Sequence, residues 1–139
     1  MNHLFDTCVL FDVFVKSEKT DQILKVLPAE IFLIDAVLFE LITLIKVRVN
    51  TQKATAVLED ILQNPDTFVI LKSDSSDYIQ AKKIMIKYDN QNPKTDFSMA
   101  DALQLAIGER ENLGLYTDDQ RLLIYPKNIV QVENPIIKS

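Results

Sequence analysis

The sequence has few of the residues that build disulfides, zinc sites and nucleotide-binding loops. It has 139 residues, with one cysteine, one histidine and two glycines. A single cysteine, Cys8, can form neither an internal disulfide nor a cysteine-based zinc site, which fits a reducing cytoplasm. The single histidine, His3, offers little for zinc. Glycine occurs only at Gly108 and Gly114, so there is no glycine-rich loop of the P-loop kind.

Long apolar runs are also missing. The longest apolar region, residues 31–47, is interrupted by Asp35, Glu40 and Lys46, whereas a membrane span needs about 20 mainly apolar residues. The start of the chain has no basic region and reaches Asp6 before any long apolar stretch, unlike a secretory signal. We therefore expect a soluble cytoplasmic protein with no membrane segment.

Positive charge is in deficit. The chain has 15 basic and 20 acidic residues, a net charge of -5, which argues against a large basic surface that grips nucleic acid. Nucleic-acid chemistry is still compatible with this balance, because acids gathered in one pocket can bind divalent cations that attract phosphate. The distribution of the acids therefore matters more than their sum.

The length and the composition, 47% hydrophobic and 25% charged, predict one compact domain over residues 1–139. All five prolines fall between the periodic segments. The apolar runs at 31–34 and 68–71 are typical of strands covered on both faces by helices. Strands and helices alternate, which predicts an α/β three-layer sandwich with a mainly parallel central sheet flanked by helices.

Periodicity and turn residues set the expected elements. We predict strands at 2–5, 31–34, 67–71, 113–117 and 129–132, and helices at 7–15, 20–27, 36–49, 52–63, 75–89 and 99–111. Two helix starts resemble a capping box, because Asp74 and Ser98 each stand three residues before an acid, Asp77 and Asp101.

Four acids are expected at one end of this sheet. Asp6 follows the first strand, Glu40 lies in the second turn of the helix after the second strand, and Asp101 lies in the first turn of its helix. Asp119 stands just beyond the strand at 113–117. In parallel sheets ligands bind outside the carboxyl ends of the strands, where the strand order reverses. Carboxylates gathered there would repel one another, and a divalent metal would supply the counterion.

Glu40 is the most informative of these acids. Its helical neighbours Val37, Leu44 and Val47 are apolar, which predicts a buried carboxylate. Burial of an ionised carboxylate without a partner costs several kcal/mol. The structural alternative is an ion pair with Lys46 or another base.

Ordinary structural roles would also explain the other acids one at a time. Asp101 can complete the cap that begins at Ser98, and Asp6 can be a helix N-cap. Asp118 and Asp119 can be turn residues. Separate caps at one rim would leave their mutual repulsion without a counterion, which favours the metal site.

Four segments together resemble the PIN-domain family, in particular the VapC-like toxins of bacterial and archaeal toxin-antitoxin pairs. They are Leu4-Phe-Asp-Thr-Cys-Val-Leu, Leu38-Phe-Glu-Leu, Ser98-Met-Ala-Asp-Ala-Leu-Gln-Leu-Ala and Leu115-Tyr-Thr-Asp-Asp-Gln-Arg-Leu. In this order and spacing they span nearly the whole chain. The resemblance implies a PIN-like fold and a ribonuclease.

The resemblance also implies which residues form the site. The catalytic set would be Asp6, Glu40, Asp101 and Asp119, with Thr117 as a supporting hydroxyl and Asp118 and Asp96 as further candidates. The doubled acid at 118–119 leaves the fourth ligand open, and Cys8 stands where the family often has a small polar residue.

For the implied activity, an all-oxygen site suits Mg²⁺ or Mn²⁺. Asp6, Asp101 and Asp119 would hold the metal, and Glu40 would orient a water that attacks an RNA phosphodiester. Arg121 is a candidate substrate-binding residue, whereas the other bases are typical of solvated helix faces. An antitoxin partner and a homodimer are further implications of the resemblance.

Three alternatives lead to other functions. A noncatalytic PIN-fold interaction module would use an apolar groove that includes Val9, Leu10, Val13, Phe14 and residues 23–27, although such spacing is more typical of core. A haloacid-dehalogenase-like phosphatase needs a second aspartate two positions after Asp6, and Cys8 is there. A phosphorylated receiver domain lacks a convincing lysine partner.

Overall fold

The computed structural model describes residues 1–15, 20, 23, 25, 27–89 and 97–135. Within these ranges, five strands form one sheet in the order β3-β2-β1-β4-β5, and each neighbouring pair is parallel. The strands are β1 (His3–Phe5), β2 (Ile31–Ile34), β3 (Phe68–Leu71), β4 (Gly114–Tyr116) and β5 (Val132–Glu133). The predicted α/β sandwich is confirmed, and its described sheet is wholly parallel rather than mainly so.

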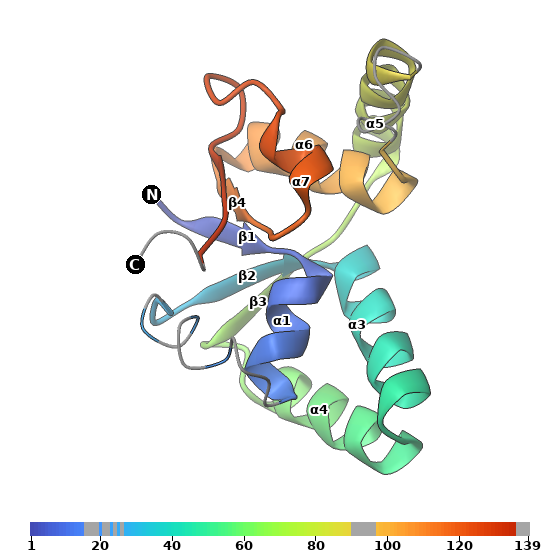
Figure 1. The fold of residues 1–139 in the computed structure, drawn as a ribbon, viewed down its shortest axis with the longest axis vertical. Helices are drawn as coiled ribbons and strands as arrows, with labels where there is room; N and C mark the ends of the chain where they lie inside the picture. Colours follow the sequence, from blue (N-terminus) through green and yellow to red (C-terminus); the bar gives the residue numbers. More distant parts are fainter. Residues whose placement is uncertain (16–19, 21–22, 24, 26, 90–96, 136–139) are drawn as a thin grey trace.

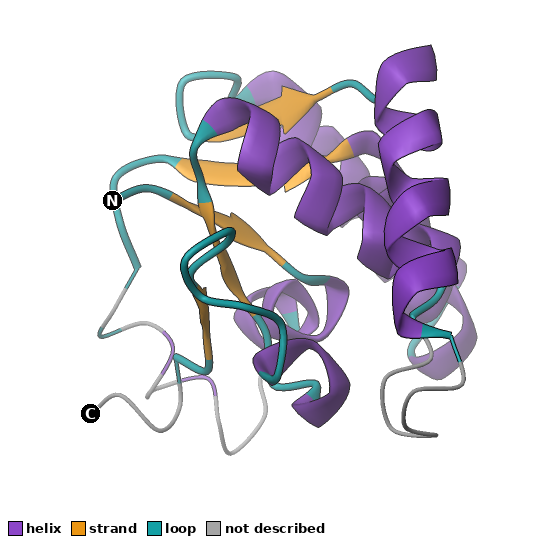
Figure 2. Cartoon of the chain, turned by 90° about the horizontal axis from the view of Figure 1, so that it is seen from above, coloured by secondary structure: helices purple, strands orange, loops and turns teal. Residues whose placement is uncertain are grey.

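Helices cover both faces of the sheet. They are α1 (Thr7–Phe14), α3 (Asp35–Arg48), α4 (Thr51–Gln63), α5 (Ser75–Tyr88), α6 (Met99–Glu111) and α7 (Gln120–Leu123). From β1 the chain moves through β2 to β3, then returns past β1 to β4 and β5. Crossovers between parallel strands are almost always right-handed, so this change of direction places the first three helices on one face of the sheet and the last three on the other. Figure 1 shows α1, α3 and α4 below the sheet and α6 and α7 above it, and Figure 2 shows the twist of the strands.

The core lies between the sheet and these helices. Leu4, Phe5, Leu33 and Leu115 on the strands are fully buried, and burial of such a side chain contributes about 1.5–3 kcal/mol. Among the described helices α6 is the most enclosed, since every residue at 101–108 is buried between the sheet and α5. Polar side chains at the start of α6 are therefore held firmly beside the strand ends.

Local capping fixes two of the helix starts as predicted. Asp74 and Asp77 form a capping box at α5, and Ser98 and Asp101 form another at α6. The four-residue helix α7 was not predicted, because one turn is too short for a periodic pattern. The last strand, predicted at 129–132, is observed at β5, after a turn in which Val130 N donates to Pro126 O.

Two further predictions concern the helices after β1. Half of the helix predicted at 20–27, residues 21, 22, 24 and 26, lies outside the described residues. The described part of the groove suggested for an interaction module is core instead, because Val9, Leu10 and Ile23 are buried and Phe14 packs against Phe68 at 5.6 Å between ring centroids. None of the described helices combines the length and apolarity needed to cross a membrane.

Candidate active site

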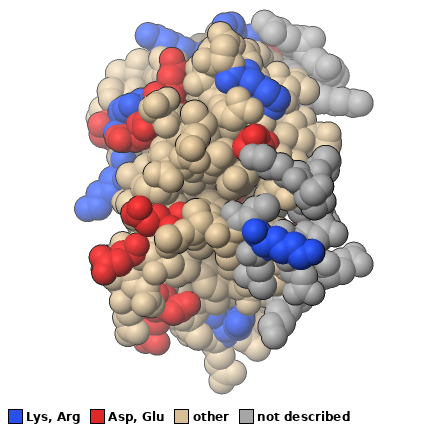
Figure 3. Space-filling view, turned by 90° about the vertical axis from the view of Figure 1, so that its left-hand side faces the viewer, with Lys and Arg blue, Asp and Glu red and all other residues tan. Residues whose placement is uncertain are grey.

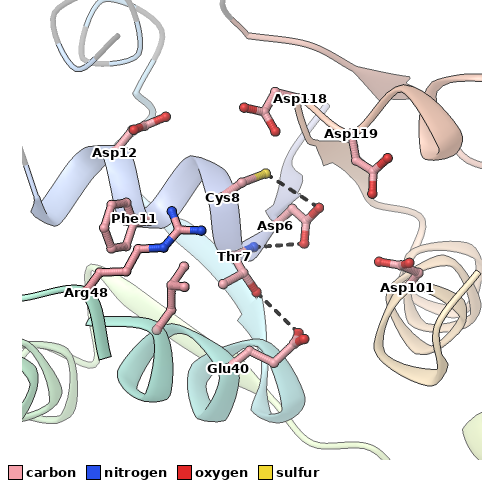
Figure 4. A pocket seen from close by; sticks show the side chains of 11 residues that line it. Asp6, Thr7, Cys8, Phe11, Asp12, Glu40, Arg48, Asp101, Asp118 and Asp119 are labelled. Atoms are coloured by element: carbon pink, nitrogen blue, oxygen red, sulfur yellow. Dashed lines mark hydrogen bonds between the residues drawn. The ribbon is translucent and has the colours of Figure 1, made fainter. Parts of the chain in front are cut away.

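A pocket of about 490 Å³ opens at the carboxyl ends of β1 and β4. β1 lies between β2 and β4, so this is the point where the strand order reverses and where ligands bind in parallel sheets. The four predicted acids come from four separate segments and all line this pocket (Figure 4). Its lining consists of Asp6, Thr7, Cys8, Phe11, Asp12, Glu40, Leu44, Arg48, Asp101, Asp118 and Asp119.

Asp6 lies at the centre of this group and is 7% exposed. Its Oδ1 accepts from Thr7 N at 2.8 Å and from Gln104 Nε2 at 2.9 Å, and its Oδ2 accepts from Thr117 Oγ1 at 2.7 Å. Asp6 N also donates to Tyr116 O, which ties the end of β1 to β4. Asp6 is thus the N-cap of α1, as the structural alternative predicted, and its carboxylate is held in one orientation at the pocket.

Asp101 also combines a cap with a place in the pocket. Its Oδ2 accepts from Ser98 N at 3.1 Å, while Ser98 Oγ accepts from Asp101 N at 3.1 Å. Burial raises the pKa of the Asp101 carboxyl, and the charges of Asp6 and Asp119 raise it further against the opposing hydrogen bonds from Ser98. The capping role is therefore real, and it does not remove the repulsion among the acids.

Glu40 lies at the pocket, but the predicted burial of its side chain is wrong. α3 packs through Val37, Leu41 and Ile45, whereas Glu40 is exposed and Val47 is 77% exposed. Glu40 Oε1 accepts from Thr7 Oγ1 at 3.3 Å.

The charge environment of Glu40 nevertheless resembles that of Asp101. Partial desolvation raises the pKa of Glu40, and the charges of Asp6 and Asp101 raise it further. Among the ion pairs of the described residues, Glu40 has none with Lys46, the structural partner suggested by the sequence.

Asp118 and Asp119, the two adjacent acids after β4, lie in different environments. Asp119 caps α7 and is paired with Arg121, with Oδ2 2.7 Å from Nη2, and this partner lowers the pKa of Asp119. Asp118 lines the pocket on the side of Cys8. Thr117 is fully buried and accepts from Asp119 N at 3.0 Å. Asp96, the remaining candidate, lies outside the described residues.

Gln104 is the residue of this region that sequence reasoning missed. It lies one helical turn after Asp101 on the same face of α6, is 1% exposed, and donates to Asp6. Its Oε1 is buried and has no partner among the described residues. Buried polar atoms are normally hydrogen-bonded, so the unpartnered Oε1 is an exception, and the hydrogen bond from Nε2 to Asp6 is the contact that the amide keeps. A lone glutamine within the apolar stretch 102–107 of α6 was the available signal.

The acids fit a hard divalent cation by their chemistry. The acidic side chains around Asp6 offer oxygen, which Mg²⁺ and Mn²⁺ prefer. Burial raises the pKa of Glu40 and of Asp101, and the charges of neighbouring acids raise both further; a cation would relieve this second contribution. Within the described part of the chain, no three acidic, histidine or cysteine side chains are already arranged as a metal site.

The raised pKa of Asp101 predicts how stability changes with pH. Between the ordinary aspartate value and the raised value, folded protein holds a proton that unfolded protein lacks, so stability falls as pH rises through this window. Asp101→Asn does not titrate and keeps an acceptor for Ser98 N. We expect melts in EDTA to show that Asp101→Asn gains stability over wild type as pH rises, and then levels off. An advantage that shrinks with rising pH would contradict this.

The comparisons with known proteins point to one family. The family model described as PIN domain matches residues 4–128. No curated protein is similar enough to count as a match.

Several solved structures share the fold. VapC20 of Mycobacterium tuberculosis, described as a sarcin-ricin loop cleaving toxin, is similar with a TM-score of 0.76 and 17% identity, over 95% of this chain and 99% of that one. A toxin-antitoxin complex from Klebsiella pneumoniae gives 0.70 and 21%, over 96% and 98%. FitAcB from Neisseria gonorrhoeae gives 0.70 and 22%, over 95% and 96%. With a family model that matches most of its length, the chain belongs to the PIN domain family.

Proposed function

We propose that this protein is a divalent-metal-dependent endoribonuclease that hydrolyses RNA phosphodiester bonds and serves as the toxin of a type II toxin-antitoxin pair. The observation that carries the proposal is that Asp6, Glu40, Asp101 and Asp119, from four segments, line one pocket where the strand order reverses. Membership of the PIN domain family supports it, as does the similarity of fold to a toxin described as cleaving the sarcin-ricin loop.

Asp6, Asp101 and Asp119 would hold Mg²⁺ or Mn²⁺, with Asp118 as the other candidate for the last position. When bound, such an ion lowers the pKa of water and neutralises charge on a phosphate. Glu40 lines the pocket from an exposed position, where its carboxylate would orient the attacking water and accept its proton. Thr7 Oγ1 steadies Glu40 by its hydrogen bond.

The residues that contact RNA would lie at the pocket itself. Arg48 lines the pocket and its guanidinium lies 5.6 Å from the centre of the Phe11 ring. On the side of the molecule shown in Figure 3, the described Lys and Arg side chains lie apart from one another and form no continuous basic strip. A short contact beside the scissile phosphate fits this charge pattern better than a long basic path. An antitoxin partner, a homodimer and a cytoplasmic location belong to the same proposal.

The test of the proposal is RNA cleavage by the purified chain, free of any bound partner. We expect labelled structured RNA to be cut at internal positions with 5 mM Mn²⁺, roughly the millimolar metal such weak oxygen sites require, and to stay intact in EDTA. RNA that stays intact at every metal concentration, with a correctly folded protein, would overturn the enzyme assignment.

The second candidate is a noncatalytic PIN-fold interaction module. One observation favours it: Asp119 already pairs with Arg121, so this acid has a counterion without a metal. Metal binding separates the two candidates. A ligand at about five times its Kd stabilises a protein by RT ln 6, about 1 kcal/mol, which is roughly 2–5 °C in Tm for a chain of this size. We expect such a rise with Mn²⁺ in a calorimetric melt, whereas an unchanged Tm at millimolar Mn²⁺ would favour the interaction module.

A further inference from the structure

Arg121 already supplies a positive charge to two of the acids in the pocket. Its backbone N donates to Asp119 Oδ1 at 3.0 Å, so the two residues form the first turn of α7. The guanidinium Nε lies 3.1 and 3.2 Å from the two oxygens of Asp119, and Nη2 lies 2.7 Å from Oδ2. The same Nη2 is 3.8 Å from Asp101 Oδ2.

This arrangement is hard to combine with a divalent ion on the same acids. Both oxygens of Asp119 accept from the guanidinium, and a dication bound to Asp119 and Asp101 would stand close to a like charge. The Arg121 side chain is 44% exposed, against 24% for Asp119 and 12% for Asp101, so it is the member of the group nearest to solvent. Displacement of the guanidinium toward solvent would leave the acids in place.

We propose that Arg121 is a resident counter-cation that competes with the divalent metal for Asp119 and Asp101, and that the displaced guanidinium then binds a phosphate of the RNA. The inference rests on the proposed function for its second half, and it adds an order of events at the site. Before metal arrives, Arg121 offsets the charge of the acids. After metal arrives, its charge is available at the rim of the pocket, where guanidinium suits phosphate.

The competition is tested by Mn²⁺ affinity rather than by activity. Calorimetric titration of Arg121→Gln is expected to show Mn²⁺ bound about fivefold more tightly than by wild type, which is the scale of a partly exposed ion pair. Arg121→Lys keeps the charge, so its Mn²⁺ affinity is expected to stay closer to wild type. Equal or weaker Mn²⁺ binding by Arg121→Gln refutes the competition, as does a failure of both proteins to bind Mn²⁺.

Arg48→Gln is the matched control, because Arg48 lines the same pocket but forms no ion pair with its acids among the described residues. It removes the same charge from the same pocket. We expect its Mn²⁺ affinity to change less than that of Arg121→Gln. An equal gain in both variants would show a general charge effect and overturn the specific competition.

The second half of the proposal is tested by cleavage kinetics at saturating Mn²⁺. Arg121→Gln is expected to raise KM for RNA about tenfold with little change in kcat, because phosphate binding is lost. An unchanged KM refutes the role at the phosphate. If wild type cleaves no RNA while Arg121→Gln binds Mn²⁺ more tightly, the proposed function fails and the competition stands. If wild type cleaves RNA and both proteins bind Mn²⁺ equally, the proposed function stands and the competition is refuted.

Discussion

Asp6→Asn is expected to lower Mn²⁺-dependent RNA cleavage by at least about 100-fold, because it removes one negative charge from the centre of the acids. Asp6 is the carboxylate on which Gln104, Thr117 and the first turn of α1 converge. A neutral amide there would hold a divalent cation weakly and would misplace it relative to Glu40. The measurement is the single-turnover cleavage rate with Mn²⁺, compared with wild type at equal protein concentration.

The same substitution is expected to leave the fold intact. Asparagine is as good an N-cap as aspartate, so its carbonyl oxygen can still accept from Thr7 N and Gln104 Nε2. Its amide would face Thr117 Oγ1, which can act as an acceptor. Thermal melts in EDTA check this point, with no loss of Tm expected.

Asp35→Asn is the matched control for Asp6→Asn. Asp35 follows β2 as Asp6 follows β1, but its carboxylate accepts from Ser73 Oγ at 2.8 Å and from Ser73 N at 3.2 Å, outside the acidic pocket. We expect Asp35→Asn to cleave RNA at close to the wild-type rate. Wild-type cleavage by Asp6→Asn would show that the catalytic assignment is wrong, and an equal loss in both variants would point to a general effect of strand-end acids.

The fold was predictable from the sequence where local signals agree with the tertiary structure. Continuous apolar runs at 31–34 and 68–71 become β2 and β3, and the capping residues Asp74 and Ser98 start α5 and α6. β5 has two residues and α7 has four, so neither is long enough for a period to be read. β5 is positioned by its pairing with β4 and α7 by its contacts with β5, and the sequence does not reveal these contacts.

The site was predictable only as far as strand ends reveal it. Asp6 and Asp119 follow strands of a parallel sheet. The carboxyl ends of parallel strands lie at one edge of the sheet, so both residues are placed at that edge whatever their side chains contact. Glu40 was selected because burial was expected, yet it lines the pocket from an exposed position. The contact of Gln104 with Asp6 joins residues 98 positions apart, so it needs the packed structure.

Gly114→Ala is expected to destabilise the protein by about 2–3 kcal/mol, because β4 leaves no room for a methyl group. A Cβ at this position would lie 2.4 and 2.6 Å from His3 ring atoms and 2.9 Å from Gln131 O. The His3 ring cannot move away cheaply, since its Nε2 is 2.7 Å from Glu133 Oε2 and the ring stacks on Tyr116 with centroids 4.0 Å apart. Gly114 has no positive φ, so close packing and not backbone strain requires glycine.

Gly108→Ala, at the other glycine of the chain, is the control that isolates this steric effect. Its Cβ would lie 3.2 Å from Leu113 O and 3.3 Å from Val130 Cγ1, a mild crowding that the gain of about 1 kcal/mol in helix propensity offsets. Urea unfolding should therefore separate the two variants, and equal stability would contradict the prediction. His3→Ala in the Gly114→Ala background should restore part of the loss, leaving the contact with Gln131 O. Because Gly114 pairs with His3 in the β1–β4 ladder, Gly114→Ala also displaces Asp6 from Thr117 and should reduce cleavage in the folded fraction.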